Sequence, residues 1–144
     1  DSALSADDRF LVGFDLKKDI DVLLRAYNDP EGVTARFNLN LLERINRELG
    51  GHFDTSSFRH FATYDVQSGA MESYLVSLKE QTVPIDGLRD EFTFGEWEAL
   101  HTEYSYKYLD SDIDSLVRHA GFVEEARVRD ERRWFCDALW KVEQ

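Results

Sequence analysis

The stretch from Leu100 to Tyr108 carries the residue types best suited to bind a small polar molecule. If it forms a β-strand, alternate side chains share a face. One face is then polar, with His101, Glu103, Ser105 and Lys107, and the other, with Thr102, Tyr104, Tyr106 and Tyr108, is suited to a core. Glu103 and Ser105 would lie roughly 6–7 Å apart along the strand, which fits recognition of a small molecule better than a catalytic triad. The same alternation is typical of an ordinary half-buried antiparallel strand, and the pattern does not separate the two interpretations.

Two further polar side chains lie on helical faces that are otherwise apolar. Between Asp19 and Asn28 the apolar residues recur with helical spacing and include Tyr27, whose hydroxyl needs a partner in the core or in a site. A second helix is predicted from the capping sequence at 29–31 to the glycines at 50–51, with Asn38 in the middle of its apolar face. That amide must be hydrogen-bonded, either to a neighbouring loop, which we favour, or to a ligand.

The remaining elements are predicted to position these residues. Phe10 to Phe14 is an almost continuous apolar run, typical of a central strand buried on both faces of a parallel sheet. Few residues precede it, so some of its sheet partners are expected to be missing. Met71 is predicted to pack in the core, and Cys136 to be a buried apolar residue rather than a nucleophile. The other predicted elements are a hairpin of 58–64 with 70–78, short strands at 81–85 and 91–94, a helix from Asp110 to Gly121, and a terminal hairpin of 122–129 with 134–142.

Composition excludes several classes of function. The net charge of −12, from 29 acidic and 17 basic residues, argues against nucleic acid and anionic membranes as partners. We find no apolar run of membrane-spanning length and no signal peptide, and one cysteine permits no internal disulfide, so a cytoplasmic location is the simplest expectation. The four histidines show no metal-ligand spacing, and the eight glycines form no nucleotide-binding loop.

Four collinear blocks of this chain resemble the family of histidine-specific, S-adenosylmethionine-dependent methyltransferases. The blocks are FLVGFDLKKD at 10–19, AYNDPEGVTARFNLN at 26–40, INREL at 45–49 and TEYSYK at 102–107. The resemblance implies a protein that adds three methyl groups to the α-amino nitrogen of L-histidine, giving hercynine, an ergothioneine precursor. It also implies that Tyr27 binds the substrate carboxylate while Glu103 and Ser105 hold the imidazole. Asn38 and Met71 are candidates for supporting positions around that site.

The resemblance covers only the C-terminal half of such proteins. It implies an α/β fold, α+β as seen in this chain, in which residues 1–16 and 108–144 end a Rossmann-like methyltransferase sheet and residues 17–107 form an inserted substrate-recognition domain. The S-adenosylmethionine site would lie outside this chain, so the chain alone is expected to be inactive. Two alternatives stay open: a family member acting on another amino acid or amine, and a non-catalytic module whose exposed sheet edge is covered by self-association or by the missing half.

Overall fold

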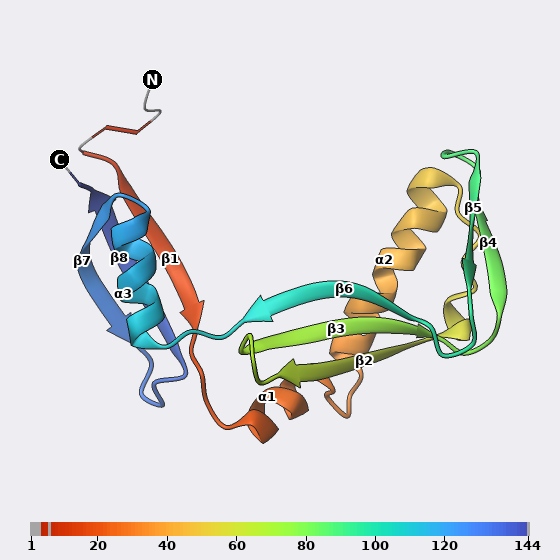
Figure 1. The fold of residues 1–144 in the computed structure, drawn as a ribbon, viewed down its shortest axis with the longest axis horizontal. Coiled ribbons are helices and arrows are strands. Elements are labelled where there is room, and N and C mark those ends of the chain that lie inside the picture. Colours follow the sequence, from red (N-terminus) through yellow and green to blue (C-terminus); the bar gives the residue numbers. More distant parts are fainter. Residues whose placement is uncertain (1–3, 6, 144) are drawn as a thin grey trace. The chain divides into compact units, whose positions relative to one another are not determined.

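The computed structural model describes residues 4–5 and 7–143, which form two compact units. One unit comprises residues 1–19 and 106–144, and the other comprises residues 20–105. The boundaries therefore lie at 19/20 and 105/106, against the predicted 16/17 and 107/108. Both units mix helices and strands, so the chain has a mixed α/β structure (Figure 1).

The first unit is a three-stranded sheet with one helix. Strand β1 (Arg9–Asp15) pairs antiparallel with β8 (Phe135–Val142), which pairs antiparallel with β7 (Phe122–Arg129). Helix α3 (Asp110–His119) precedes β7 and packs against it (Figure 1). The helix and the predicted terminal hairpin are confirmed. The buried core of this unit consists of Phe14, Leu16, Ile113, Val117, Cys136, Ala138 and Trp140.

Within the described chain β1 is exposed along one side, as expected of a strand some of whose sheet partners are missing, and its ladder with β8 is antiparallel rather than parallel. In this sheet β1 is an edge strand, because β8 is its only ladder partner. Phe10 and Leu11 are 53% and 66% exposed, and Phe14 is the buried residue of the strand. An apolar run in the sequence indicates that its side chains are hydrophobic, but it does not indicate which strands or helices pack against them.

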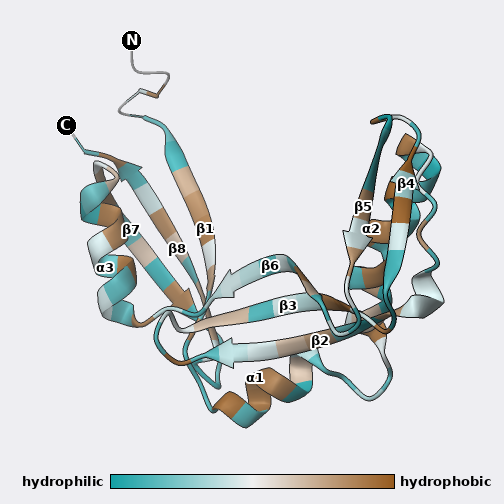
Figure 2. Ribbon diagram, turned by 45° about the vertical axis from the view of Figure 1, so that its right-hand side comes forward, coloured by the Kyte–Doolittle hydropathy of each residue, from teal (hydrophilic) through white to brown (hydrophobic). Residues whose placement is uncertain are grey.

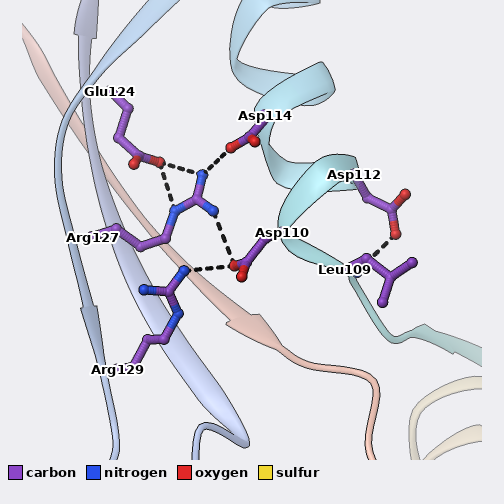
Figure 3. Close-up of polar contacts among 7 residues, drawn as sticks. All are labelled: Leu109, Asp110, Asp112, Asp114, Glu124, Arg127 and Arg129. Carbon is purple, nitrogen blue, oxygen red and sulfur yellow. Dashed lines mark hydrogen bonds and ion pairs between the residues drawn. The ribbon is translucent and has the colours of Figure 1, made fainter.

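An ion-pair network joins α3 to β7 (Figure 3). The guanidinium of Arg127 contacts carboxylates of Asp110, Asp114 and Glu124 at 3.1, 2.6 and 2.7 Å, and its side chain is only 9% exposed. Arg129 adds a contact of 2.7 Å to Asp110. Burial opposes the charge of Arg127, but hydrogen bonds to the carboxylates outweigh it and raise the pKa of the guanidinium. The two guanidiniums therefore offset most of the charge of the three carboxylates within the unit.

A second charged group lies at the end of β1. Asp15 binds the ammonium of Lys18 and lies 2.9 Å from that of Lys107, whose side chain is 1% exposed. Burial acts to raise the pKa of Asp15, but the two ammonium groups outweigh it and hold this pKa below its ordinary value of 3.8. The prediction that Lys107 shares the polar face of the 100–108 strand is therefore wrong, because β6 ends at Tyr106 and Asp15 holds Lys107 in the interior.

Cys136 is fully buried and unpaired by a disulfide, as expected of a core residue. Burial raises the pKa of its thiol. The protonated thiol is the less nucleophilic form, so this environment does not activate Cys136.

The second unit contains two sheets and two α-helices. Strands β2 (Phe58–Asp65), β3 (Ala70–Ser77) and β6 (Ala99–Tyr106) form one sheet in the order β2-β3-β6. Strands β4 (Gln81–Ile85) and β5 (Asp90–Phe94) form a separate antiparallel hairpin. The predicted hairpin of β2 and β3 is confirmed, with Gly69 at a φ of 74° in its loop, and a short 3₁₀ helix, Thr55–Ser57, precedes β2.

Helices α1 (Ile20–Tyr27) and α2 (Val33–Leu49) pack on β2 and β3, and hydrophobic residues colour much of α1 brown in Figure 2. Both helices were predicted, but α2 begins after Gly32 rather than at 29–31. Asp29 still caps it, because its carboxylate accepts hydrogen bonds from the N–H groups of Thr34 and Val33, which lower its pKa to about 2. Gly50 ends α2 at a φ of 64°, as predicted.

Two clusters form the core of this unit. Below α1, Leu23, Ala62 and Met71 are buried together, with Tyr27 packed against them. The second cluster joins α2 to both sheets through Leu42, Phe53, Phe58, Leu75, Val83, Ile85 and Phe94. Because α1 and α2 each press an apolar face onto the same hairpin, the ends of both helices are fixed relative to β2 and β3.

Candidate functional site

The structure brings Tyr27 and Ser105 together. Tyr27 ends α1, Ser105 lies near the end of β6, and the phenol hydroxyl donates a hydrogen bond of 2.7 Å to the serine Oγ. Both side chains are half-buried. The two hydroxyls are 78 positions apart in sequence, so the packing of α1 beneath the sheet creates this pair. Paired hydroxyls at the edge of a core can both donate to and accept from a bound polar molecule.

Glu103 lies two positions before Ser105 and is exposed. It lines a groove of about 330 Å³ between α2 and β6, together with Phe37, Asn38, Asn40, Leu41, Arg44 and Thr102. Within the described part of the chain, the Glu103 carboxylate makes no hydrogen bond or ion pair. The groove therefore combines an open carboxylate and several polar side chains with the apolar side chains of Phe37, which is 74% exposed, and Leu41. Such a mixture suits an aromatic or cationic group that carries an N–H donor.

The groove and the hydroxyl pair are distinct, but β6 contributes to both. Neither Tyr27 nor Ser105 lines the groove, although Glu103 and Ser105 are alternate residues of β6. The structure thus brings two of the three predicted binding residues into contact and places the third, Glu103, in the adjacent groove. A small molecule with polar groups at both ends would be needed to contact all three.

The prediction that the tyrosine face of β6 is suited to a core is wrong. Tyr104 and Tyr106 are 55% and 48% exposed, because β6 is an edge strand and both helices pack on β2 and β3 instead. The His101 ring contacts those of Tyr74 and Tyr104 at centroid distances of 5.2 and 4.0 Å, so the two faces predicted by strict alternation are not separate at this point of β6. Tyr74 donates to Glu72, and this hydrogen bond raises the pKa of its phenol to about 12. Alternation predicted the strand, while the face that is covered depends on the helices.

The two supporting candidates occupy different environments. The Asn38 side chain donates hydrogen bonds to Nδ1 of His60 at 2.9 Å and to the carbonyl of Tyr74 at 3.2 Å, and Asn38 also lines the groove. Met71 is fully buried in the cluster under α1, where Tyr27 packs. Asn38 is thus bonded to structural partners beside the groove, and Met71 packs beneath Tyr27.

Sequence analysis did not single out His60 and Asn28, whose side chains connect the end of α1 to β2. His60 donates from Nε2 to the Tyr27 carbonyl at 2.9 Å, and the Asn28 side chain bonds both the N–H and the carbonyl of Ala62. One signal was available for Asn28. An asparagine directly after a helix commonly bonds nearby backbone groups.

The described residues 4–5 and 7–143 contain no cluster of three or more His, Cys, Asp or Glu side chains that could hold a metal ion. Among these residues, no helix has both the length and the apolar character required to cross a membrane.

The acid that ends β1, Asp15, is bound by two lysines. The Asp15 carboxylate is therefore not free to bind a cofactor hydroxyl.

A family model described as "Histidine-specific methyltransferase, SAM-dependent" matches residues 1–142. The chain belongs to this family. Similar proteins include a histidine N-alpha-methyltransferase of Mycobacterium tuberculosis, 39% identical over 90% of this chain, and one of Mycolicibacterium smegmatis, 37% identical over 82%. An L-tryptophan methyltransferase of Psilocybe serbica is 30% identical over 90% of this chain.

The chain spans well under half the length of these methyltransferases. It covers 38%, 37% and 36% of the Mycobacterium, Mycolicibacterium and Psilocybe proteins respectively. The family assignment predicted from the four sequence blocks is confirmed. The activity and substrate of the whole protein are proposals for this chain.

Proposed function

We propose that this chain is the C-terminal, substrate-recognising part of an S-adenosylmethionine-dependent enzyme that methylates the α-amino group of L-histidine. The product would be hercynine, a precursor of ergothioneine. In this proposal residues 17–107 form the substrate-recognition domain, and residues 1–16 with 108–144 end a Rossmann-like sheet. The observation that carries the proposal is the 2.7 Å contact between the Tyr27 and Ser105 hydroxyls, beside the open Glu103 carboxylate.

Each of the three groups has a chemical role that suits histidine. The phenol of Tyr27 has a single O–H donor, which on binding would turn from Ser105 to the substrate carboxylate and leave the Ser105 hydroxyl to the imidazole. A neutral imidazole has one N–H donor and one acceptor nitrogen, so the Glu103 carboxylate can accept from the first and the Ser105 hydroxyl can donate to the second. A site of this kind rejects analogues that leave its polar groups without partners.

These residues would act by orientation rather than by proton transfer. The cofactor, when bound, supplies a methyl group already activated on a sulfonium. Holding both ends of histidine would fix its amino nitrogen in line with that methyl, which is the main requirement for transfer. Leu41 and Phe37, on the apolar wall of the groove, would limit water around the ring.

The test is calorimetric titration with L-histidine of the complete polypeptide that contains this chain. Tyr27→Phe and Glu103→Gln should each weaken histidine binding by about tenfold, because each removes a hydrogen bond to a charged or buried polar group. Tyr64→Phe and Glu91→Gln are matched controls outside the hydroxyl pair and the groove, and they should leave the affinity unchanged. Unchanged histidine affinity in both site variants would refute the proposal.

L-tryptophan is a second candidate substrate, and the same titration tests it. The Psilocybe relative is named for L-tryptophan, and an exposed Phe37 beside the groove could contact an indole. An indole has one N–H donor and no acceptor nitrogen, so it would use Glu103 without needing Ser105. Tryptophan binding that survives Ser105→Ala, with histidine binding absent, would favour this alternative.

The non-catalytic alternative predicts association instead of ligand binding. It requires the exposed edge of β1 to be covered by a second copy of the chain or by another part of the protein. Light scattering of the chain across a range of concentrations measures this directly. A dilute monomer would count against self-association through that edge.

A further inference from the structure

The C-terminal end of α1 is tied to the edge strand β2 at two consecutive residues. The carbonyl of Tyr27 accepts a hydrogen bond from Nε2 of His60 at 2.9 Å. Next along the chain, the Asn28 amide donates to the Ala62 carbonyl at 2.8 Å and accepts from the Ala62 N–H at 2.9 Å. The last carbonyls of a helix lack intrahelical partners, and the bond from His60 satisfies one of them. The Asn28 bonds satisfy backbone groups on the edge of β2 that would otherwise need water.

His60 is itself held from its other side. Its Nδ1 accepts from the side-chain amide of Asn38 at 2.9 Å, and the same amide donates to the Tyr74 carbonyl at 3.2 Å. Because Nε2 faces a carbonyl and Nδ1 faces an amide donor, these partners select the neutral imidazole with its proton on Nε2. Asn38 therefore fixes both the ring orientation and the tautomer of His60.

This chain of bonds links the two parts of the candidate site. At one end is Tyr27, whose hydroxyl lies 2.7 Å from Ser105. At the other end is Asn38, which lines the groove that contains Glu103. A tyrosine has only two side-chain torsions, so a fixed backbone and a packed ring determine where its hydroxyl lies.

We propose that His60 is a positioning residue for Tyr27: it holds the end of α1 so that the Tyr27 hydroxyl meets Ser105 beside the groove. This inference rests on the proposed function, because it assigns His60 a part in histidine binding without contact to the substrate. Asn38 acts through His60, by orienting its ring. Displacement of a binding group by about 1 Å is sufficient to weaken a preorganised site.

Two substitutions of His60 separate its two bonds. A glutamine amide reaches the position of Nε2, so His60→Gln keeps a donor for the Tyr27 carbonyl, whereas the shorter His60→Asn does not reach it. In the complete polypeptide, His60→Asn should raise the Kd for L-histidine by about tenfold and leave that for S-adenosylmethionine unchanged. His60→Gln should stay within about threefold of the parent. The control His52→Asn, at an exposed histidine paired with Asp86, should change neither affinity.

A double-mutant cycle distinguishes positioning from general stabilisation. If His60 acts through Tyr27, His60→Asn should cost little further histidine affinity once Tyr27→Phe has removed the hydroxyl. A cost in the Tyr27→Phe background equal to that in the parent would overturn the proposal. Circular dichroism checks that each variant is folded, and His60→Gln provides the second variant if His60→Asn is not.

A readout without substrate keeps this inference separate from the proposed function. With ¹³C-labelled tyrosine rings, NMR of the ligand-free protein should show a shifted Tyr27 ring signal in His60→Asn and an unshifted one in His52→Asn. An unshifted Tyr27 signal in His60→Asn would refute the role of His60, whatever the protein binds. Loss of the proposed function alone would instead appear as unchanged histidine binding in Tyr27→Phe and Glu103→Gln.

Discussion

The two units differ in the partners of their charged side chains. In the unit of residues 1–19 and 106–144, charges are paired internally: Arg127 contacts three carboxylates, and Asp15 contacts two lysines. In the unit of residues 20–105, ion pairs such as Arg44 with Glu48 lie at the surface. Neutral hydrogen bonds anchor the end of α1, and the Glu103 carboxylate lines a groove. In our proposal the second unit binds the substrate, because the Glu103 carboxylate stays open to a ligand there.

The largest effect on stability is expected in the core of the second unit. Met71→Ala should lower the free energy of unfolding by about 3 kcal/mol, because Met71 is fully buried and its truncation leaves a cavity beneath α1. Met71→Leu, which keeps the volume, should cost less than about 1.5 kcal/mol. Urea unfolding followed by circular dichroism measures both, and a Met71→Ala cost below that of Met71→Leu would show that the site is not packed as described.

The next largest effect is expected in the charged interior of the first unit. Asp15→Asn removes the carboxylate that holds the buried ammonium of Lys107 and should cost about 2 kcal/mol. This figure is below the usual cost of breaking a buried pair, because the Asp15 side chain is 34% exposed. Asp137→Asn changes an exposed carboxylate of β8 and is the control, expected within about 0.5 kcal/mol of the parent.

The comparison of the parent with Asp15→Asn also gives a prediction about pH. The pKa of Asp15 is lowered in the folded state, so its contribution to stability is present above the ordinary value of 3.8 and is lost as pH falls through the folded value. The difference in unfolding free energy between the parent and Asp15→Asn should therefore be constant near neutral pH and shrink below about pH 4. Urea titrations at a series of pH values test this, and a difference that grows on acidification would contradict the assigned ion pair.

A smaller effect is expected from the ion-pair network of the first unit, in which Asp110 and Asp114 are half exposed to water. Arg127→Met should cost about 1 kcal/mol, because water can solvate the carboxylates of Asp110 and Asp114 once the guanidinium is removed. Methionine retains much of the apolar contact of the arginine stem. Arg59→Met, at an exposed position of β2, is the matched control and should be close to neutral. Thermal unfolding measures both variants. An equal loss of unfolding free energy in Arg127→Met and Arg59→Met would show that the network does not stabilise the fold.

The smallest effect on stability is expected at Glu103. Glu103→Gln should change the unfolding free energy by less than about 0.5 kcal/mol, because this exposed carboxylate has no partner in the described part of the chain. Its effect should appear in histidine binding instead. A large loss of stability in Glu103→Gln would mean that the carboxylate supports the fold and would weaken its assignment to a site.

Local pattern predicted most of the elements and little of their environment. The 3.6-residue spacing predicted α1, α2 and α3, and the glycines at 50 and 69 predicted a helix end and a turn. The same patterns did not predict the antiparallel pairing of β1 with β8, and they were wrong about the tyrosines in β6. Exposure depends on which distant segments pack on a face, and a local run of residues contains no record of them.

The sequence by itself determined the family of this protein, its helices and strands, and the residue types from which a histidine site could be built. Only the tertiary structure decided that the Tyr27 hydroxyl meets Ser105, that Lys107 is buried against Asp15, and that His60 and Asn38 hold the end of α1. The physical reason is that helix and strand periodicities follow from bonds between near neighbours, whereas each of these contacts requires two distant segments to be packed together.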